Sequence, residues 1–221
     1  MAGLAIVIGA GPGLGAALAR RFARGGFDVA AVARDARRLD GLAREIRAAG
    51  GRAEGFSADV TDFASIRRAV MAAAETFGPP RVLIYNVSQW VPAEAPDLDP
   101  EILDLQLRIC ATSALAATQA VLPAMRGDGG TVLWTGGGLA LRPQNGRASP
   151  ALTAGKSAMR GLALATAPAL HDIGINFATI TVNGAIAPDT RFAPDRIAER
   201  FWQAHEAPRS DWTGEIIFDG A

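Results

Sequence analysis

The stretch LAIVIGAGPGLG, residues 4–15, decides the fold. Leu4 to Ile8 form an uninterrupted apolar run of the length of a buried strand, and a glycine-rich turn follows at once. Apolar residues then recur at helical spacing from Leu14 to Phe22, until Gly25 and Gly26 end the pattern. Glycines let backbone amides approach a pyrophosphate, whose charge the N-terminus of the next helix favours. A strand, a glycine turn and a helix in this order predict a dinucleotide site.

The rest of the chain repeats the alternation of apolar strand and amphipathic helix. Further strands are expected at residues 28–33, 52–57, 81–85, 131–135, 176–182 and 215–218. Further helices are expected at residues 36–49, about 62–77, in stretches around 101–126, and at 153–170 and 194–205. Alternation of this kind predicts an α/β fold in which helices cover both faces of a parallel sheet.

Composition narrows the class of protein. The 221 residues are 49% hydrophobic and 20% charged, which excludes a disordered chain and suits one domain spanning residues 1–221. No apolar run approaches the ~20 residues of a membrane-spanning helix, so no membrane partner is expected. Twenty-two acidic and 22 basic side chains give zero formal charge, which argues against nucleic acid as a partner. A single cysteine, Cys110, and the two separated histidines, His171 and His205, predict no metal site and fit a cytoplasmic protein.

Several motifs carry a resemblance to one family. The turn has the spacing G-x-x-x-G-x-G, and the segments at Asn86, at residues 118–125 (TQAVLPAM), at 184–186 and at 214–220 follow in order. Together they resemble the short-chain dehydrogenase/reductase family, whose members bind NAD(H) or NADP(H). The resemblance implies a three-layer Rossmann fold with a doubly wound, seven-stranded parallel sheet of order 3-2-1-4-5-6-7. It also implies a short lid at about residues 187–213 and a homodimer or homotetramer.

The resemblance implies a cofactor site as well. Its residues would be Gly9, Gly11, Pro12, Gly13, Leu14, Gly15, Arg34, Asp59, Val60, Asn86, Lys156, Gly184 and Ile186. Arg34, at the end of the second strand, favours NADP(H), because a guanidinium can hold a 2′-phosphate through two charged hydrogen bonds. Asp35 keeps NAD(H) open as an alternative, and Arg34 can also be read as part of a solvated helix start.

The catalytic pattern of the family is broken in this chain. Members carry a tyrosine four residues before a lysine, and here Leu152 precedes Lys156. The family serine falls within the glycines at 136–138, and the family asparagine aligns with Cys110. Lys156 is therefore the main catalytic candidate, and Thr153, beside the vacant position, is a second candidate that could orient a substrate oxygen.

The broken pattern leaves different functions open. One is an NADP(H)-dependent oxidoreductase that acts on a small, largely apolar carbonyl-type substrate, with Lys156 or water as the proton source. Another is a catalytically inactive dinucleotide-binding sensor or scaffold, and a third is a fold that has lost its ligand. An apolar substrate cleft could be lined by Trp90, Leu139, Leu152, Phe192 and Trp202, and each aromatic among them could equally belong to the ordinary core.

Overall fold

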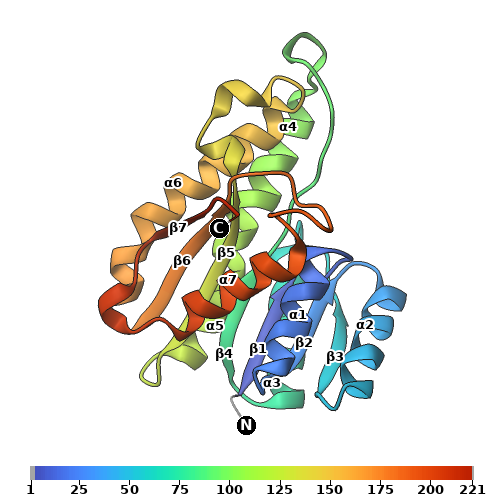
Figure 1. The fold of residues 1–221 in the computed structure, drawn as a ribbon, viewed down its shortest axis with the longest axis vertical. Coiled ribbons are helices and arrows are strands. Elements are labelled where there is room, and N and C mark those ends of the chain that lie inside the picture. Colours follow the sequence, from blue (N-terminus) through green and yellow to red (C-terminus); the bar gives the residue numbers. More distant parts are fainter. Residues whose placement is uncertain (1–2, 221) are drawn as a thin grey trace.

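The computed structural model describes residues 3–220. Seven parallel strands form one sheet in the order β3-β2-β1-β4-β5-β6-β7, as predicted (Figure 1). The strands are β1 (Leu4–Ile8), β2 (Asp28–Ala33), β3 (Ala53–Ser57), β4 (Pro80–Tyr85), β5 (Gly130–Gly137), β6 (Ile175–Val182) and β7 (Glu215–Phe218). The order reverses direction between β1 and β4, which is the place where open α/β sheets bind ligands.

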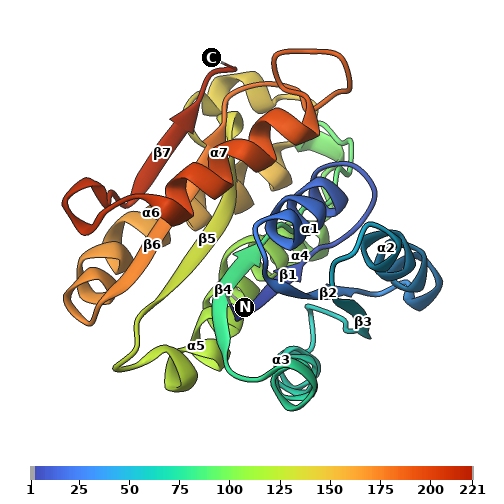
Figure 2. The same cartoon turned by 60° about the horizontal axis from the view of Figure 1, so that its bottom comes forward.

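Helices cover both faces of the sheet and complete a three-layer fold (Figure 2). They are α1 (Leu14–Arg24), α2 (Ala36–Ala48), α3 (Phe63–Phe77), α4 (Pro100–Leu107), α5 (Ser113–Met125), α6 (Pro150–Asp172) and α7 (Pro194–Glu206). One hydrophobic cluster joins α1, α2 and α7 to the sheet, and a second joins α3, α5 and α6 to its other face. The predicted Rossmann architecture is confirmed.

Strand β1 shows how the core is built. Ala5 and Val7 pack into the cluster beneath α1, while Leu4, Ile6 and Ile8 pack into the cluster on the opposite face. Every residue of β1 is buried, because parallel strands in the middle of a three-layer fold have no solvent-facing side. The continuous apolar run in the sequence therefore has a simple structural cause.

Two predicted boundaries near the site are wrong. Helix α6 begins at Pro150 rather than Thr153, because proline suits the first helical turn, where its missing N–H would have no intrahelical partner. Strand β5 continues beyond Thr135, since Gly136 and Gly137 pair with residues of β6. Glycines are depleted in strands, which is why the sequence pattern ended this strand early.

Helices α4 and α5 are joined through a π-helical turn, Arg108–Thr112. The combined run Pro100–Met125 is long and apolar enough to cross a membrane by length and composition. Half of the residues in its apolar window are buried in the protein, where α4 packs on α6 and α5 packs on α3. A core helix of a soluble protein has the same properties, so this run is accounted for by packing.

Candidate functional site

The glycines of the turn between β1 and α1 have two different roles. A Cβ on Gly9 would overlap the carbonyl of Asn86, and a Cβ on Gly15 would overlap the carbonyl of Gly9. These two glycines allow β1, β4 and α1 to approach closely. Gly11 and Gly13 instead face open space, with nothing within 4 Å of an added Cβ. One side of the turn is therefore packed tightly against the protein, and the other side is open to solvent or to a ligand.

The open side of the turn forms a cleft of about 490 Å³ at the carboxyl ends of β1, β2 and β4. Ten of the thirteen predicted cofactor residues line it. They are Gly9, Gly11, Pro12, Gly13, Leu14, Gly15, Arg34, Val60, Asn86 and Ile186. The cleft also includes four residues that are not among the predicted cofactor residues, Ala33, Ala58, Val87 and Ser88. Each lies directly beside a predicted cofactor residue or motif in the sequence.

Arg34 and Asp35 are neighbours in sequence but differ in their surroundings. Arg34 is exposed and lines the cleft, and its guanidinium has no hydrogen-bond or ion-pair partner among residues 3–220. Asp35 caps the N-terminus of α2 by accepting a hydrogen bond from the Arg38 backbone N–H at 3.2 Å. It also forms an ion pair with the Arg38 Nε at 3.1 Å. The cation at this strand end is thus free to meet a ligand, whereas the carboxylate is engaged.

Asp59, Gly184 and Lys156 lie outside the lining of this cleft. The Asp59 carboxylate accepts hydrogen bonds from the backbone N–H and the hydroxyl of Thr61, at 2.9 and 2.8 Å, so it stabilises its own turn. Gly184 packs against the ring of Phe192 and faces a neighbouring cleft. Short polar side chains after strands often close turns, and this competing use could not be separated from ligand binding in the sequence.

Lys156 lies on α6 with its side chain buried. Its Nζ donates hydrogen bonds to the carbonyl of Thr135 at 2.8 Å and to the carbonyl of Val87 at 3.4 Å. Burial lowers the pKa of the Lys156 ammonium, and the nearby Cys110 opposes this shift. The lysine therefore joins the ends of β4 and β5, outside the lining of both clefts, in a state that releases a proton more readily than a surface lysine.

No described hydroxyl takes the place of the family tyrosine. Leu152 lies one turn before Lys156 on α6 and packs against the core. The Thr153 hydroxyl donates to the carbonyl of Ser149 at 3.0 Å, which gives Thr153 a structural contact in the first turn of α6. The Tyr85 hydroxyl donates to the carbonyl of Ile109 at 2.5 Å, and burial raises its pKa. That Thr153 orients a substrate oxygen stays a prediction. Tyr85 belongs to the core.

A second cleft of about 380 Å³ lies beside the first. Its lining consists of Trp90, Gly138, Leu139, Arg142, Asn145, Asn183, Gly184 and Ala185. Segment 183–186 separates the two clefts, since Ile186 lines the first and the three preceding residues line the second. The second cleft is therefore in the place where a substrate could meet a cofactor held in the first.

The predicted apolar cleft is only partly correct. Trp90 and Leu139 line the second cleft, whereas Leu152 and Phe192 do not. Trp202 is wrongly placed by the prediction, because it packs edge-on against Phe22 in the core between α1 and α7. Helix α7 is amphipathic, and Trp202 lies on the face that packs against α1. The indole therefore contributes to the core between the two helices and does not line a pocket.

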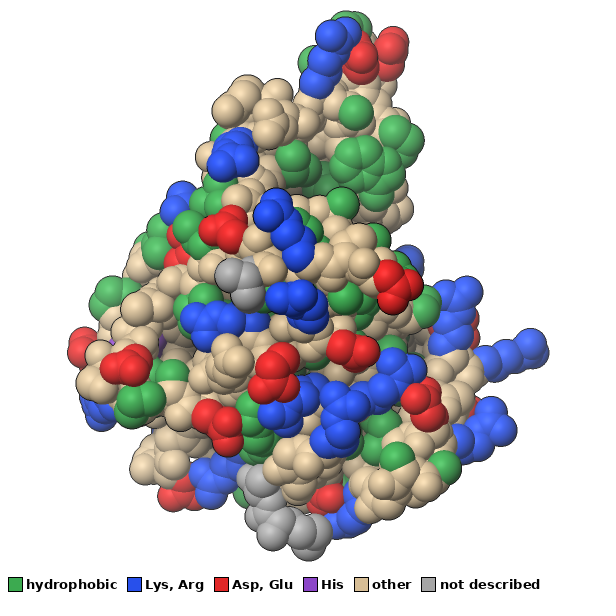
Figure 3. Space-filling view, viewed as in Figure 1, with side chains coloured by type: hydrophobic (Ala, Val, Ile, Leu, Met, Phe, Trp, Pro, Cys, Tyr) green, Lys and Arg blue, Asp and Glu red, His purple; other side chains and the backbone are tan. Residues whose placement is uncertain are grey.

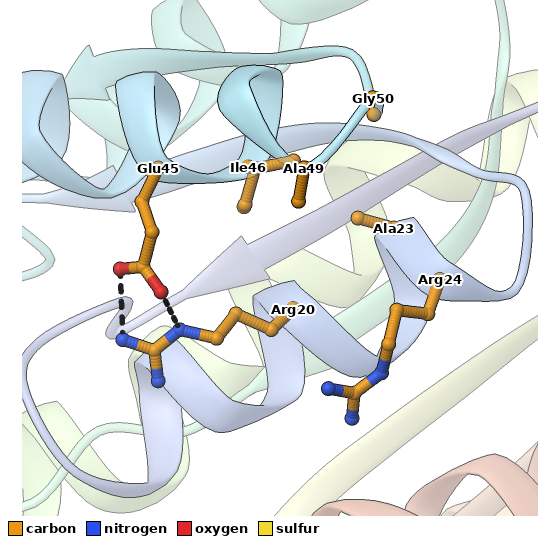
Figure 4. Close-up of a pocket in the computed structure, with 8 residues that line it drawn as sticks. Arg20, Ala23, Arg24, Glu45, Ile46, Ala49 and Gly50 are labelled. Atoms are coloured by element: carbon orange, nitrogen blue, oxygen red, sulfur yellow. Dashed lines mark hydrogen bonds and ion pairs between the residues drawn. The ribbon is translucent and has the colours of Figure 1, made fainter.

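Another hollow, of about 500 Å³, lies between α1 and α2 (Figure 4). Arg20 and Glu45 face each other across it, and the guanidinium donates to both carboxylate oxygens at 2.6 and 2.9 Å. Their charges are thus mutually satisfied. None of the predicted cofactor residues lines this hollow, so we place the candidate site in the two clefts at the carboxyl ends of the strands.

Comparisons with known proteins agree with this assignment. The sequence model of the short chain dehydrogenase family matches residues 3–193. The chain is 30% identical over 198 residues to 2,5-dichloro-2,5-cyclohexadiene-1,4-diol dehydrogenase LinX of Sphingobium indicum, covering 89% of this chain and 78% of that protein. A short-chain dehydrogenase from Rhodopseudomonas palustris superposes with a TM-score of 0.88 at 27% identity, over 98% of each chain.

A blue fluorescent protein from a metagenomic library, solved in complex with NADPH, superposes with a TM-score of 0.87 at 28% identity. The alignment covers 99% of this chain and 96% of that one. The match therefore extends over the whole fold, including both clefts. On the family match and these relatives, the chain belongs to the short chain dehydrogenase family.

Proposed function

We propose that the protein is an NADP(H)-dependent oxidoreductase that acts on a small carbonyl-type substrate with a largely apolar body. The observation that carries the cofactor choice is the contrast between Arg34, which lines the cleft without a partner, and Asp35, which is engaged in capping α2. The 2′-phosphate of NADP(H) would supply the negatively charged partner that the Arg34 guanidinium lacks. The metagenomic relative bound to NADPH, at 28% identity, supports the same choice.

The residues of the first cleft fit a dinucleotide. Gly11 and Gly13 leave room for a pyrophosphate beside the N-terminus of α1, whose dipole favours negative charge. When bound, the cofactor supplies or accepts a hydride.

Lys156 is the residue we assign to proton handling. Its ammonium is fixed by the carbonyls of Thr135 and Val87, and its lowered pKa brings proton release closer to neutral pH. Gly137 lies over the lysine stem, because a Cβ there would be 3.6 Å from the Lys156 Cγ. A serine at this position, as in the family, would therefore place its side chain against the stem of the lysine.

A second candidate function is a non-catalytic dinucleotide-binding protein. Leu152 in the tyrosine position and Gly137 in the serine position favour it, because neither side chain can donate a proton. Both functions share the cofactor site. For both we propose one domain and association into a homodimer or homotetramer in the cytoplasm. For the lid predicted at about residues 187–213 we propose the loops that flank α7, since α7 itself packs on α1 in the core.

The decisive experiment is a titration with NADPH and NADH, read by energy transfer from tryptophan to the nicotinamide. Arg34→Gln should weaken NADPH binding about 10- to 100-fold, since a charge-assisted hydrogen bond contributes about 1.5–3 kcal/mol. NADH binding should stay unchanged. Arg37→Gln is the matched control, because Arg37 is exposed and absent from the cleft lining. Equal affinity of wild type and Arg34→Gln for NADPH would contradict the cofactor assignment.

A turnover screen then separates the two candidate functions. Small aldehydes and ketones are offered with NADPH to wild type and to Lys156→Met, which retains the length of the stem without the ammonium. Turnover by wild type that collapses in Lys156→Met supports the oxidoreductase. Tight NADPH binding without turnover of any carbonyl supports the non-catalytic protein.

A further inference from the structure

The second cleft carries one feature that its proposed role as a substrate site does not explain. Arg142 is the only charged residue in its lining. The side chain is exposed, and its guanidinium has no hydrogen-bond or ion-pair partner within residues 3–220. A cation at the mouth of a small pocket, with no carboxylate beside it, is available to an anionic ligand.

The neighbouring arginine is paired with a carboxylate, unlike Arg142. Arg147, in the same loop, donates to the Glu94 carboxylate at 3.0 Å. Asn183, which lines the second cleft, donates a hydrogen bond from its side chain to the Asp219 carboxylate at 2.6 Å. Both carboxylates are thus paired with residues other than Arg142.

The remaining walls of the second cleft are apolar or amide. Trp90 is 60% exposed, which is unusual for an indole in a folded chain, and Leu139 is half-buried on the other wall. Asn145 adds an amide beside Arg142. The lining combines a flat aromatic surface, an aliphatic contact and one cation with an amide neighbour.

The two loops that form these walls are joined to each other. The backbone N–H of Ala93 donates to the carbonyl of Ala148 at 3.1 Å, and the Ser149 hydroxyl donates to the carbonyl of Val91 at 3.1 Å. Both loops project at the top of Figure 1, and hydrophobic side chains gather on this lobe in Figure 3. These bonds hold Trp90 and Arg142 on one frame, so the cleft has a defined shape before a ligand arrives.

We infer that the substrate carries a carboxylate, which Arg142 binds, and an apolar body that packs on Trp90 and Leu139. This inference rests on the proposed function and names the substrate class of the same site. A cleft of about 380 Å³ accepts a small molecule such as an aromatic or short aliphatic oxo acid. Its carbonyl would extend past Gly138 toward the glycine that lies over Lys156.

The test compares two ligands that differ only in charge. 4-Formylbenzoate and 4-formylbenzamide have the same length and ring, and each is titrated into the protein saturated with NADP⁺, so that no turnover occurs. Quenching of tryptophan fluorescence reports binding. We expect wild type to prefer the benzoate by at least about tenfold, which corresponds to about 1.4 kcal/mol, because one charge-assisted hydrogen bond is gained. The preference should disappear in Arg142→Gln and return in part in Arg142→Lys.

Arg147→Gln is the matched control, because it removes an exposed arginine from the same loop without touching the cleft lining. It should keep the preference of the wild type. Equal binding of the two ligands by wild type, an unchanged preference in Arg142→Gln, or no binding of the benzoate each overturns the carboxylate assignment. Failure of the proposed function is a separate result, because it appears as loss of NADP⁺ binding before either aldehyde is added.

Discussion

The two roles of the glycines in the turn predict opposite consequences for the same small substitution. In Gly9→Ala the new methyl overlaps the Asn86 carbonyl, and the backbone is held at φ +87°, where residues with a Cβ are strained. A left-handed conformation costs about 1–2 kcal/mol and overpacking costs about 1–3 kcal/mol. Together they predict a loss of about 3 kcal/mol from the free energy of unfolding. For a domain of this size that lowers the melting temperature by about 6–12 °C.

Gly11→Ala is the matched substitution on the open side of the turn. Nothing lies within 4 Å of the added Cβ, and Gly11 is not among the residues of positive φ. Its stability should therefore equal that of wild type or rise by up to about 1 kcal/mol, because alanine restricts the unfolded chain. The methyl enters the cleft, however, and NADPH binding should weaken. Calorimetry and cofactor titration of both variants check this, and a Gly9→Ala protein that melts within 2 °C of wild type refutes the reasoning.

Three further outcomes follow from the site. The pKa of Lys156, the single lysine, is lowered in the folded protein, so the unfolded chain binds the extra proton between that pKa and the ordinary lysine value of about 10.4. Burial raises the pKa of the Cys110 thiol, so that group lowers stability with rising pH in wild type and in Lys156→Met alike. The contribution of Lys156 is therefore read from the difference between the two proteins, and the melting temperature of wild type should gain on that of Lys156→Met from pH 8 to pH 10. Gly137→Ser should fold with nearly unchanged stability because an added Cβ makes ordinary contacts at 3.6 Å or more, whereas Gly136→Ser meets two threonine hydroxyls at 2.6 Å and should unfold in clearly lower urea. Tyr85→Phe should cost about 1 kcal/mol, from the lost bond to Ile109, and leave NADPH binding unchanged in the fluorescence titration.

The sequence was sufficient for the elements whose patterns have one physical cause. The apolar run at residues 4–8 could only be a strand buried on both faces, and the turn after it could only be tight. The same holds for Arg34, because a strand end beside a glycine turn places its side chain at the cleft. The role of each of these residues follows from the local backbone geometry, and the residues next to it in the sequence determine that geometry.

The sequence was insufficient where a side chain could satisfy two needs. Asp59 could bind a ligand or close its turn, and the structure shows the second contact. Trp202 could line a pocket or fill the core, and only the packing of α7 on α1 decides between them. Arg142 carried no motif at all, since the sequence does not tell which arginine of this loop pairs with Glu94 and which lines a cleft.

The order of the strands also has a consequence for how the chain is made. The central strand β1 precedes the other six described strands in the chain, yet one of its two neighbours, β4, follows only at Pro80–Tyr85. Until that segment leaves the ribosome, one edge of a wholly apolar strand has no hydrogen-bonding partner, which is the condition under which nascent chains aggregate. We expect the first half of this protein to depend on chaperones during translation, and to be released from them once β4 has paired.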